Sequence, residues 1–294
     1  MTHFEQLVPP DARLERLATG AVWSEGPAYF AQDDSIVWSD IPNNRLLRWS
    51  AQDGMTVWRS PANFENGHYF DAEMRLLSCE HGRRCISRTE QDGSVTVLVD
   101  RFDGKRLNSP NDLVVKSDGT IWFTDPPYGI VSDREGYQAE SELGDNFVFR
   151  FDPVTKELSI VTDVVEEPNG LAFSPDESIL YVADTSCAFR EDGNHHIMQF
   201  DIVNGRKALN PRLFAEINPG AGDGFRLDIH GNIFTSAADG VHIYTPDAIF
   251  LGKIAVPETV GNVTFGGPQK NRLFIAASTS LYAITLNTRG IQKP

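Results

Sequence analysis

The stretch Pro168-Asn169-Gly170-Leu171-Ala172-Phe173, with the turn Ser174-Pro175-Asp176-Glu177 and the apolar run Ile179 to Ala183, decides the fold. A polar signature precedes a short strand, a turn of residues that tolerate tight backbone geometry, and a second strand. Related signatures occur six times along the chain, namely Glu25-Gly26-Pro27, Asn66-Gly67-His68, Pro110-Asn111-Asp112, Pro168-Asn169-Gly170, Gly222-Asp223-Gly224 and Gly261-Asn262-Val263. A recurrence of this length is typical of propeller blades, whose first strands line a central channel. Six oxygen-bearing side chains would then converge on one axis.

The repeats predict an all-β fold. Each signature leads into short runs rich in Val, Ile, Phe, Trp and Tyr, separated by Asp, Asn, Gly and Pro clusters. We predict one domain over residues 1–294, a six-bladed β-propeller of four-stranded antiparallel blades starting near residues 25, 66, 111, 169, 223 and 262. The sixth repeat runs out of chain after its third strand, so residues 13–18 should supply the outer strand and close the ring.

A second set of acids ends the second strand of four repeats, at Asp40, Glu80, Asp125 and Asp184. For most of them we expect capping of backbone amides, and Asp125 is the exception that we assign to substrate. Two long loops, 126–146 and 185–196, should form walls over the channel mouth. Tyr128 lies in the first and is assigned to substrate.

His68 follows the second channel position and is assigned to the substrate pocket. The alternative, that it packs beneath the pocket, stays open at this point.

The charge and the cysteine content limit the classes of binding partner and the compartment that we expect for this protein. The net charge of −15 argues against nucleic acid and against anionic membranes. We expect no signal peptide in residues 1–17, which have no basic start and no apolar segment, and we expect no run that crosses a bilayer. Three cysteines without such a peptide fit a reducing compartment. We expect a cytoplasmic monomer or homodimer that acts on a small molecule.

Four channel positions combine two carboxylates with two amides: Glu25, Asn111, Asn169 and Asp223. These hard oxygen ligands suit Ca²⁺, Mg²⁺ or Mn²⁺ more than Zn²⁺. The alternative is that they only order channel water or satisfy the strand starts. We predict one divalent cation, Ca²⁺ first, with Mg²⁺, Mn²⁺ and Zn²⁺ as further candidates.

At these residues the chain resembles the superfamily of gluconolactonase, senescence marker protein and luciferin-regenerating enzyme. The stretches that carry the resemblance are Ser24-Glu25-Gly26-Pro27, Leu107 to Asp112, Ile121 to Pro126, Pro168 to Phe173 and Gly222-Asp223-Gly224. The resemblance implies a six-bladed propeller with one divalent cation in the channel. It implies Glu25, Asn169 and Asp223 as metal ligands, Asn111 as a fourth ligand or substrate contact, and Asp223 as proton acceptor and donor.

Two departures refine the resemblance. Ser109 stands where the vertebrate branch has a sugar-binding arginine, and the stretches Asn108 to Asp112 and Phe123 to Pro126 look more like those of bacterial gluconolactonases. Arg226 stands where a phosphotriesterase branch has an acid that supports a second calcium, so no second calcium site is expected.

The resulting hypothesis is metal-dependent hydrolysis of a sugar lactone to its aldonic acid. Asp223 is the catalytic residue, and Asn111, His68, Asp125 and Tyr128 contact substrate. The alternatives are a phosphotriesterase-like hydrolase on the same metal site and a binding propeller without chemistry.

Overall fold

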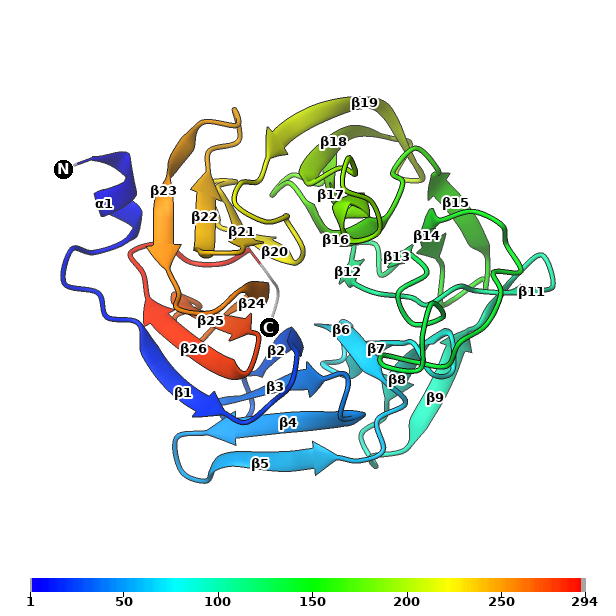
Figure 1. Ribbon diagram of the computed structural model, residues 1–294, viewed down its shortest axis with the longest axis horizontal. Coiled ribbons are helices and arrows are strands. Elements are labelled where there is room, and N and C mark those ends of the chain that lie inside the picture. Colours follow the sequence, from blue (N-terminus) through cyan, green and yellow to red (C-terminus); the bar gives the residue numbers. More distant parts are fainter. Residues whose placement is uncertain (1, 292–294) are drawn as a thin grey trace.

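Six antiparallel sheets of four strands stand around one central axis in the computed structural model, which describes residues 2–291 (Figure 1). Neighbouring strands of a sheet follow one another along the chain, and the first strand of each repeat lies nearest the axis. The predicted six-bladed β-propeller is confirmed.

The first five blades have the same order, from inner to outer strand. Blades one and two contain β2 (Ser24–Phe30), β3 (Ser35–Asp40), β4 (Arg45–Ser50), β5 (Gly54–Arg59), β6 (Glu65–Phe70), β7 (Leu76–Glu80), β8 (Cys85–Thr89) and β9 (Val95–Val99). Blades three and four contain β12 (Leu113–Val115), β13 (Ile121–Asp125), β14 (Phe147–Phe151), β15 (Leu158–Thr162), β16 (Pro168–Phe173), β17 (Ile179–Asp184), β18 (His196–Val203) and β19 (Lys207–Glu216). Blade five contains β20 (Phe225–Leu227), β21 (Ile233–Ala237), β22 (Gly240–Tyr244) and β23 (Phe250–Ala255).

The sixth blade closes the ring with a strand from the other end of the chain. Its order is β24 (Val260–Gly266), β25 (Arg272–Ala277), β26 (Ser280–Thr285) and then β1 (Glu15–Thr19). Strand β1 is antiparallel to β26, with Glu15 opposite Ala283 and Thr19 opposite Ser280. The predicted N-terminal closing strand is therefore present, and it covers the edge that β26 would expose.

Three short elements were not predicted from the repeat. They are α1 (His3–Leu7), the hairpin β10 (Arg101–Phe102) and β11 (Lys105–Arg106), and the 3₁₀ turn η1 (Ser186–Ala188). Helix α1 is held by a capping box in which Thr2 and Glu5 satisfy each other's backbone amides. No helix in residues 2–291 is long and apolar enough to cross a membrane.

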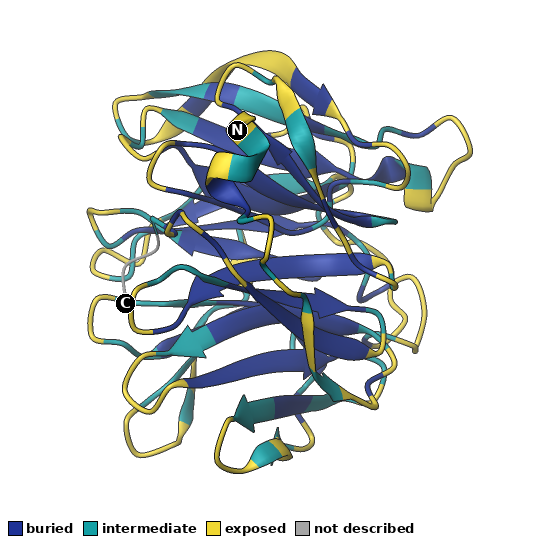
Figure 2. Ribbon diagram, turned by 90° about the vertical axis from the view of Figure 1, so that its left-hand side faces the viewer, coloured by how far each residue is buried: buried dark blue, intermediate teal, exposed yellow. Residues whose placement is uncertain are grey.

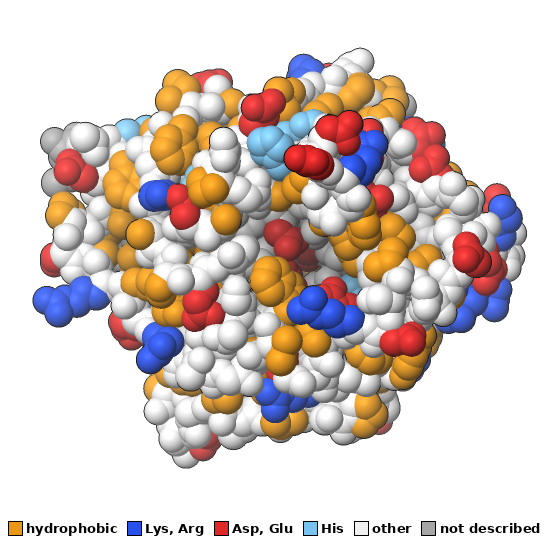
Figure 3. All heavy atoms as spheres, viewed as in Figure 1, with side chains coloured by type: hydrophobic (Ala, Val, Ile, Leu, Met, Phe, Trp, Pro, Cys, Tyr) orange, Lys and Arg blue, Asp and Glu red, His pale blue; other side chains and the backbone are white. Residues whose placement is uncertain are grey.

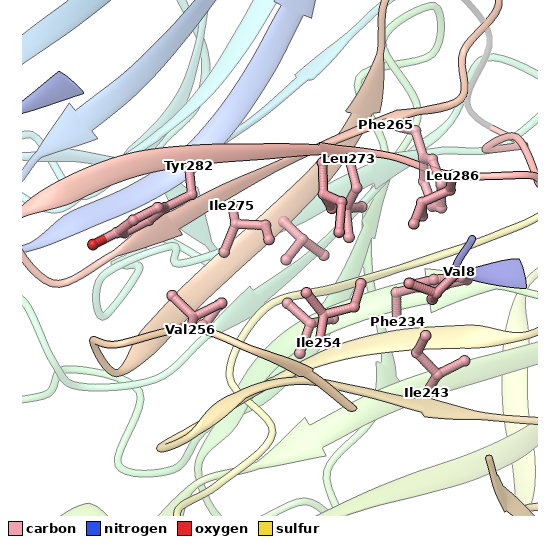
Figure 4. Close-up of a cluster of buried hydrophobic side chains, with 14 of the residues drawn as sticks. Val8, Phe234, Ile243, Ile254, Val256, Phe265, Leu273, Ile275, Tyr282 and Leu286 are labelled. Atoms are coloured by element: carbon pink, nitrogen blue, oxygen red, sulfur yellow. The ribbon is translucent and has the colours of Figure 1, made fainter. Parts of the chain in front are cut away.

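The hydrophobic core lies between neighbouring blades. One cluster joins blades five and six, where Phe234 and Ile254 meet Phe265, Ile275 and Tyr282 (Figure 4). Similar clusters fill four further blade interfaces. Buried residues occupy the inner strands and exposed residues the loops and outer edges (Figure 2). Each sheet buries both faces because it stands between two others, which explains the nearly continuous apolar runs in the inner strands.

The inner strands approach each other most closely at the signatures. The Gly170 amide donates to the Asp223 carbonyl of the next blade (3.0 Å), and a Cβ at Gly170 would lie 2.1 Å from that oxygen. A Cβ at Gly26 would likewise lie 1.9 Å from the Asn66 carbonyl oxygen. Only glycine allows this approach, which brings the neighbouring polar side chains to one end of the axis.

Candidate active site

A cavity of about 270 Å³ lies at the end of the axis where the inner strands begin. The four predicted metal ligands, Glu25, Asn111, Asn169 and Asp223, all line it, and each comes from a different blade. Acidic side chains are visible at the centre of this ring of blades (Figure 3). The structure thus brings together residues up to 198 positions apart in sequence.

Glu25 is buried and only partly satisfied. Its Oε2 accepts from the Gly26 backbone amide (2.9 Å) and from Asn262 Nδ2 (3.1 Å). Its Oε1 is buried and has no hydrogen-bond partner within residues 2–291. A buried carboxylate oxygen without a partner is costly, so this atom is suited to receive a cation or a donor group.

Asp223 is the second buried carboxylate in the cavity, and the pKa values of both Glu25 and Asp223 are raised. Burial raises the pKa of Glu25 to about 7, and the nearby charge of Asp112 adds to the shift. Burial, and then the charge of Glu25, raise the pKa of Asp223 well above its usual range. Two buried carboxylates that repel each other are stabilised in their charged forms by a divalent cation between them.

A hydroxyl from the β17–η1 connection orients Asn169. Asn169 Nδ2 donates to Thr185 Oγ1 (3.1 Å), and the Tyr128 hydroxyl shares that oxygen in a short hydrogen bond. Because its Nδ2 is engaged, Asn169 has its Oδ1 left to act as an acceptor in the cavity.

The residues fit a divalent oxygen-liganded cation. They supply two carboxylates, two amide oxygens and an unpartnered buried oxygen on Glu25. No group of three or more His, Cys, Asp or Glu side chains in the described part of the chain is arranged as a metal cluster. The candidate set therefore depends on its two amides, Asn111 and Asn169.

The two long loops do form walls of this cavity. The loop between β13 and β14 contributes Tyr128 and Glu135, and the segment after β17 contributes Thr185, Cys187 and Ala188. The Tyr128 ring stacks on Phe189 (centroids 5.3 Å apart), which joins the two loops above the site.

His68 does not line this cavity. Its Nδ1 pairs with the Gly26 carbonyl (2.7 Å) and its Nε2 with Glu65 Oε2 (3.1 Å), and the side chain is buried. It instead borders a separate cavity toward the other end of the inner strands. The assignment of His68 to substrate is corrected, because Nδ1 joins blade two to the Gly26 carbonyl of blade one and Nε2 is engaged by Glu65 of its own strand.

Asp125 is also absent from the cavity wall. Its side chain is 0% exposed, and Oδ2 accepts from the Asn108 backbone amide (2.8 Å). Asp40 and Asp184 make the same kind of bond to amides 18 residues earlier, those of Val22 (2.8 Å) and Glu166 (3.1 Å). The capping interpretation therefore extends to Asp125, and its assignment to substrate is corrected.

A buried polar chain beneath the site was not predicted as a unit. Asn262 Nδ2, which donates to Glu25, also lies 3.4 Å from Asp112 Oδ2. Arg226 Nη1 contacts the same Asp112 oxygen at 3.4 Å. Asn262 and Asp112 stand in the sequence signatures, so the signal was present, but their partners depend on the closed ring. The wall residues Asn66, Glu135 and Thr185 were also not assigned.

A comparison with models of protein families shows to which family the chain belongs. Residues 23–279 match the model described as "SMP-30/Gluconolactonase/LRE-like region". The chain belongs to this family. The SMP-30/gluconolactonase/LRE-like region includes all six signatures, as the resemblance in sequence predicted.

Curated relatives of this family are similar over most of the chain. A gluconolactonase of Zymomonas mobilis is 30% identical over 296 residues, which cover 94% of this chain and 82% of the relative. A pentonolactonase of Haloferax volcanii is 26% identical over 275 residues, which cover 86% and 81%.

A solved family structure has the same architecture. The structure of a gluconolactonase from Xanthomonas campestris is 40% identical in sequence, with a TM-score of 0.90, and the match covers 97% of this chain and 93% of that one.

Proposed function

We propose that this protein hydrolyses a sugar lactone, an aldonolactone similar to gluconolactone, to the aldonic acid with the help of one divalent cation. Ca²⁺ is expected first, with Mg²⁺, Mn²⁺ and Zn²⁺ as further candidates. One observation carries the proposal. Two carboxylates and two amides from four blades meet in one cavity, where Glu25 Oε1 is buried without a partner.

Glu25, Asn169 and Asp223 would hold the cation, and Asn111 would complete the set or contact substrate. When bound, the cation supplies Lewis-acid polarisation of the lactone carbonyl and stabilises the charge that develops on its oxygen. The Thr185 hydroxyl keeps the Asn169 amide in the orientation that this role needs.

Asp223 moves the proton. One of its carboxylate oxygens takes a proton from water as the water oxygen forms a bond to the carbonyl carbon. The same carboxyl then gives the proton to the ring oxygen as the bond between that oxygen and the carbonyl carbon breaks. The products are one hydroxyl and one carboxylic acid, so the atoms of lactone and water are all accounted for.

The walls orient the sugar. Asn111 and Tyr128 face the cavity and can hydrogen-bond ring hydroxyls. Two backbone bonds hold Asn111: its amide donates to the Thr124 carbonyl (2.9 Å), and its carbonyl accepts from the Gly67 amide (2.8 Å).

The relatives support the reaction class. Proteins similar over most of this chain are named gluconolactonase and pentonolactonase, and the similar solved structure is that of a gluconolactonase. Both names describe hydrolysis of an aldonolactone.

The test is pH-indicator hydrolysis of glucono-, xylono- and galactonolactone by protein stripped with EDTA. Each of the four cations is then returned singly. We expect turnover of at least one lactone that depends on the added cation. Full activity in EDTA-stripped protein would refute the cation dependence, and no turnover with any cation would refute lactone hydrolysis.

A further inference from the structure

A second cavity, of about 300 Å³, lies toward the end of the inner strands that is opposite to the candidate active site. The inner strands of four blades, β2, β6, β20 and β24, contribute to its wall. The apolar and aromatic part of the wall includes Pro27, Ala28, Tyr29, Phe70 and Phe265. A cavity of this size and lining is of the kind that binds small organic molecules, and the chemistry above gives it no role.

A buried guanidinium, that of Arg226, belongs to this wall. The side chain lines the cavity although only 2% of it is exposed. Its Nη1 donates to the Phe225 carbonyl (2.8 Å) and lies 3.4 Å from Asp112 Oδ2, so both protons of that nitrogen are used. Nε and Nη2 are buried and have no hydrogen-bond partner within residues 2–291. A buried charge with three unused N–H bonds is costly, and a bound acceptor would remove that cost.

The unused donors of Arg226 share one edge of the guanidinium. The proton of Nε and one proton of Nη2 are parallel, and this is the geometry that binds both oxygens of a carboxylate. The Tyr69 ring, which also lines the cavity, packs beside the guanidinium, with its centroid 5.8 Å from Cζ. The wall therefore combines a donor pair for a carboxylate with aromatic surface for an apolar body.

The charged side chains around the cavity favour an anion with a single charge. Arg226 and Lys270 line the wall, and Asp34 is the one carboxylate among the described residues that do so. Asp34 is exposed and accepts a hydrogen bond from the Tyr29 hydroxyl (2.7 Å). Asp112, outside the wall, already offsets part of the charge of Arg226. A monoanion is therefore better balanced here than a dianion such as phosphate.

We propose that this cavity is a second binding site, which takes a small carboxylate with an aromatic or other apolar body. The two carboxylate oxygens accept hydrogen bonds from Nε and Nη2 of Arg226, and the apolar body packs against Tyr29, Phe70 and Phe265. The site needs neither a cation nor a lactone, so it is independent of the proposed function.

The first test is calorimetric titration of the full chain with benzoate at neutral pH, after treatment with EDTA so that benzoate cannot bind a cation in the candidate active site. We expect one benzoate per chain, with a Kd of about 1 mM or lower. Benzamide, which has the same shape and no charge, should bind at least about tenfold more weakly. Gluconate and inorganic phosphate, which lack an apolar body, should also bind at least about tenfold more weakly. No saturable binding of benzoate, or equal binding of any of the other three, would overturn the proposal.

The second test removes the guanidinium. Arg226→Met keeps an apolar side chain of similar length, and benzoate affinity should fall at least about tenfold, to that of benzamide. The matched control is Arg13→Met, which removes an exposed arginine outside the cavity and should bind benzoate as the wild type does. Equal affinity of Arg226→Met and the wild type for benzoate would refute the role of Arg226.

A third measurement needs no substitution, because Arg226→Met leaves Asp112 without its charged neighbour and can impair folding. A crystal structure of the wild type grown with benzoate should show the carboxylate within hydrogen-bond distance of Arg226 Nε and Nη2, and the ring between Tyr29 and Phe265. Benzoate bound only elsewhere, including only in the candidate active site, would show that this cavity is not the site that we propose.

Discussion

Removal of the negative charge of Glu25 should stabilise the cation-free protein at neutral pH. The pKa of Glu25 is raised from 4.5 to about 7 by burial. Between these values the folded state binds more protons than the unfolded state, so the free energy of unfolding falls as pH rises from about 4.5 to 7 and then levels off. A shift of this size corresponds to about 3 kcal/mol.

In Glu25→Gln the amide oxygen can keep the bonds from Gly26 and Asn262, and the amide nitrogen can donate toward Asp223. The cation-free variant should therefore unfold at higher denaturant than the wild type at pH 8, by up to about 3 kcal/mol, and show no excess at pH 4.5. Asp125, with a pKa raised to about 7, titrates in the same window in both proteins and cancels, so the difference between them reports the charge of Glu25 together with its effect on Asp223.

The assay is urea unfolding at pH 4.5, 6, 7 and 8, with EDTA or with Ca²⁺ at about 100 times its dissociation constant. Ca²⁺ at that level should stabilise the wild type at pH 8 by about 3 kcal/mol. The variant, which lacks one charged ligand, should gain less. If the two proteins lose stability equally from pH 4.5 to 8, or gain equally from Ca²⁺, the reasoning about Glu25 is wrong.

Four further predictions concern single side chains. Asp223→Asn should lower kcat for the best lactone by about 10²- to 10⁴-fold, measured with the cation at saturation, and retention of wild-type kcat would exclude it as the base. Thr185→Val leaves the Asn169 amide without its partner and should weaken cation affinity about 10- to 100-fold by calorimetry, with an unchanged fold by circular dichroism. His68→Ala should lower stability in urea by about 2 kcal/mol, since two buried bonds are lost, and a rise in KM without loss of stability would restore its substrate role. Asp184→Ala should cost about 2 to 3 kcal/mol of stability and leave kcat within about twofold, because its carboxylate caps backbone amides, and a large loss of kcat in a stable variant would contradict that role.

Much of the candidate site could be predicted from sequence. Glu25, Asn111, Asn169 and Asp223 recur at equivalent places in the repeat, so a ring of blades necessarily brings them to one end of the axis. The structure places all four in one cavity. Their role as metal ligands remains the proposal that the experiments above test.

Two residues that we assigned to substrate, His68 and Asp125, lie outside the cavity wall for the same physical reason. His68 and Asp125 stand next to signature or strand-end positions, and a strand alternates the direction of its side chains. Whether a polar group there faces the cavity or a neighbouring backbone depends on the adjacent blade and loop. The Gly26 carbonyl takes up His68, and the Asn108 amide takes up Asp125.

The sequence by itself determined the six-bladed ring, its closure by β1 and the family, because each follows from a local pattern that repeats. The tertiary structure decided what surrounds the polar cluster. Thr185 orients Asn169, and the His81 contact holds Glu135 in the wall. These contacts join segments 16 and 54 residues apart through loops with no repeat, so only the folded chain defines them.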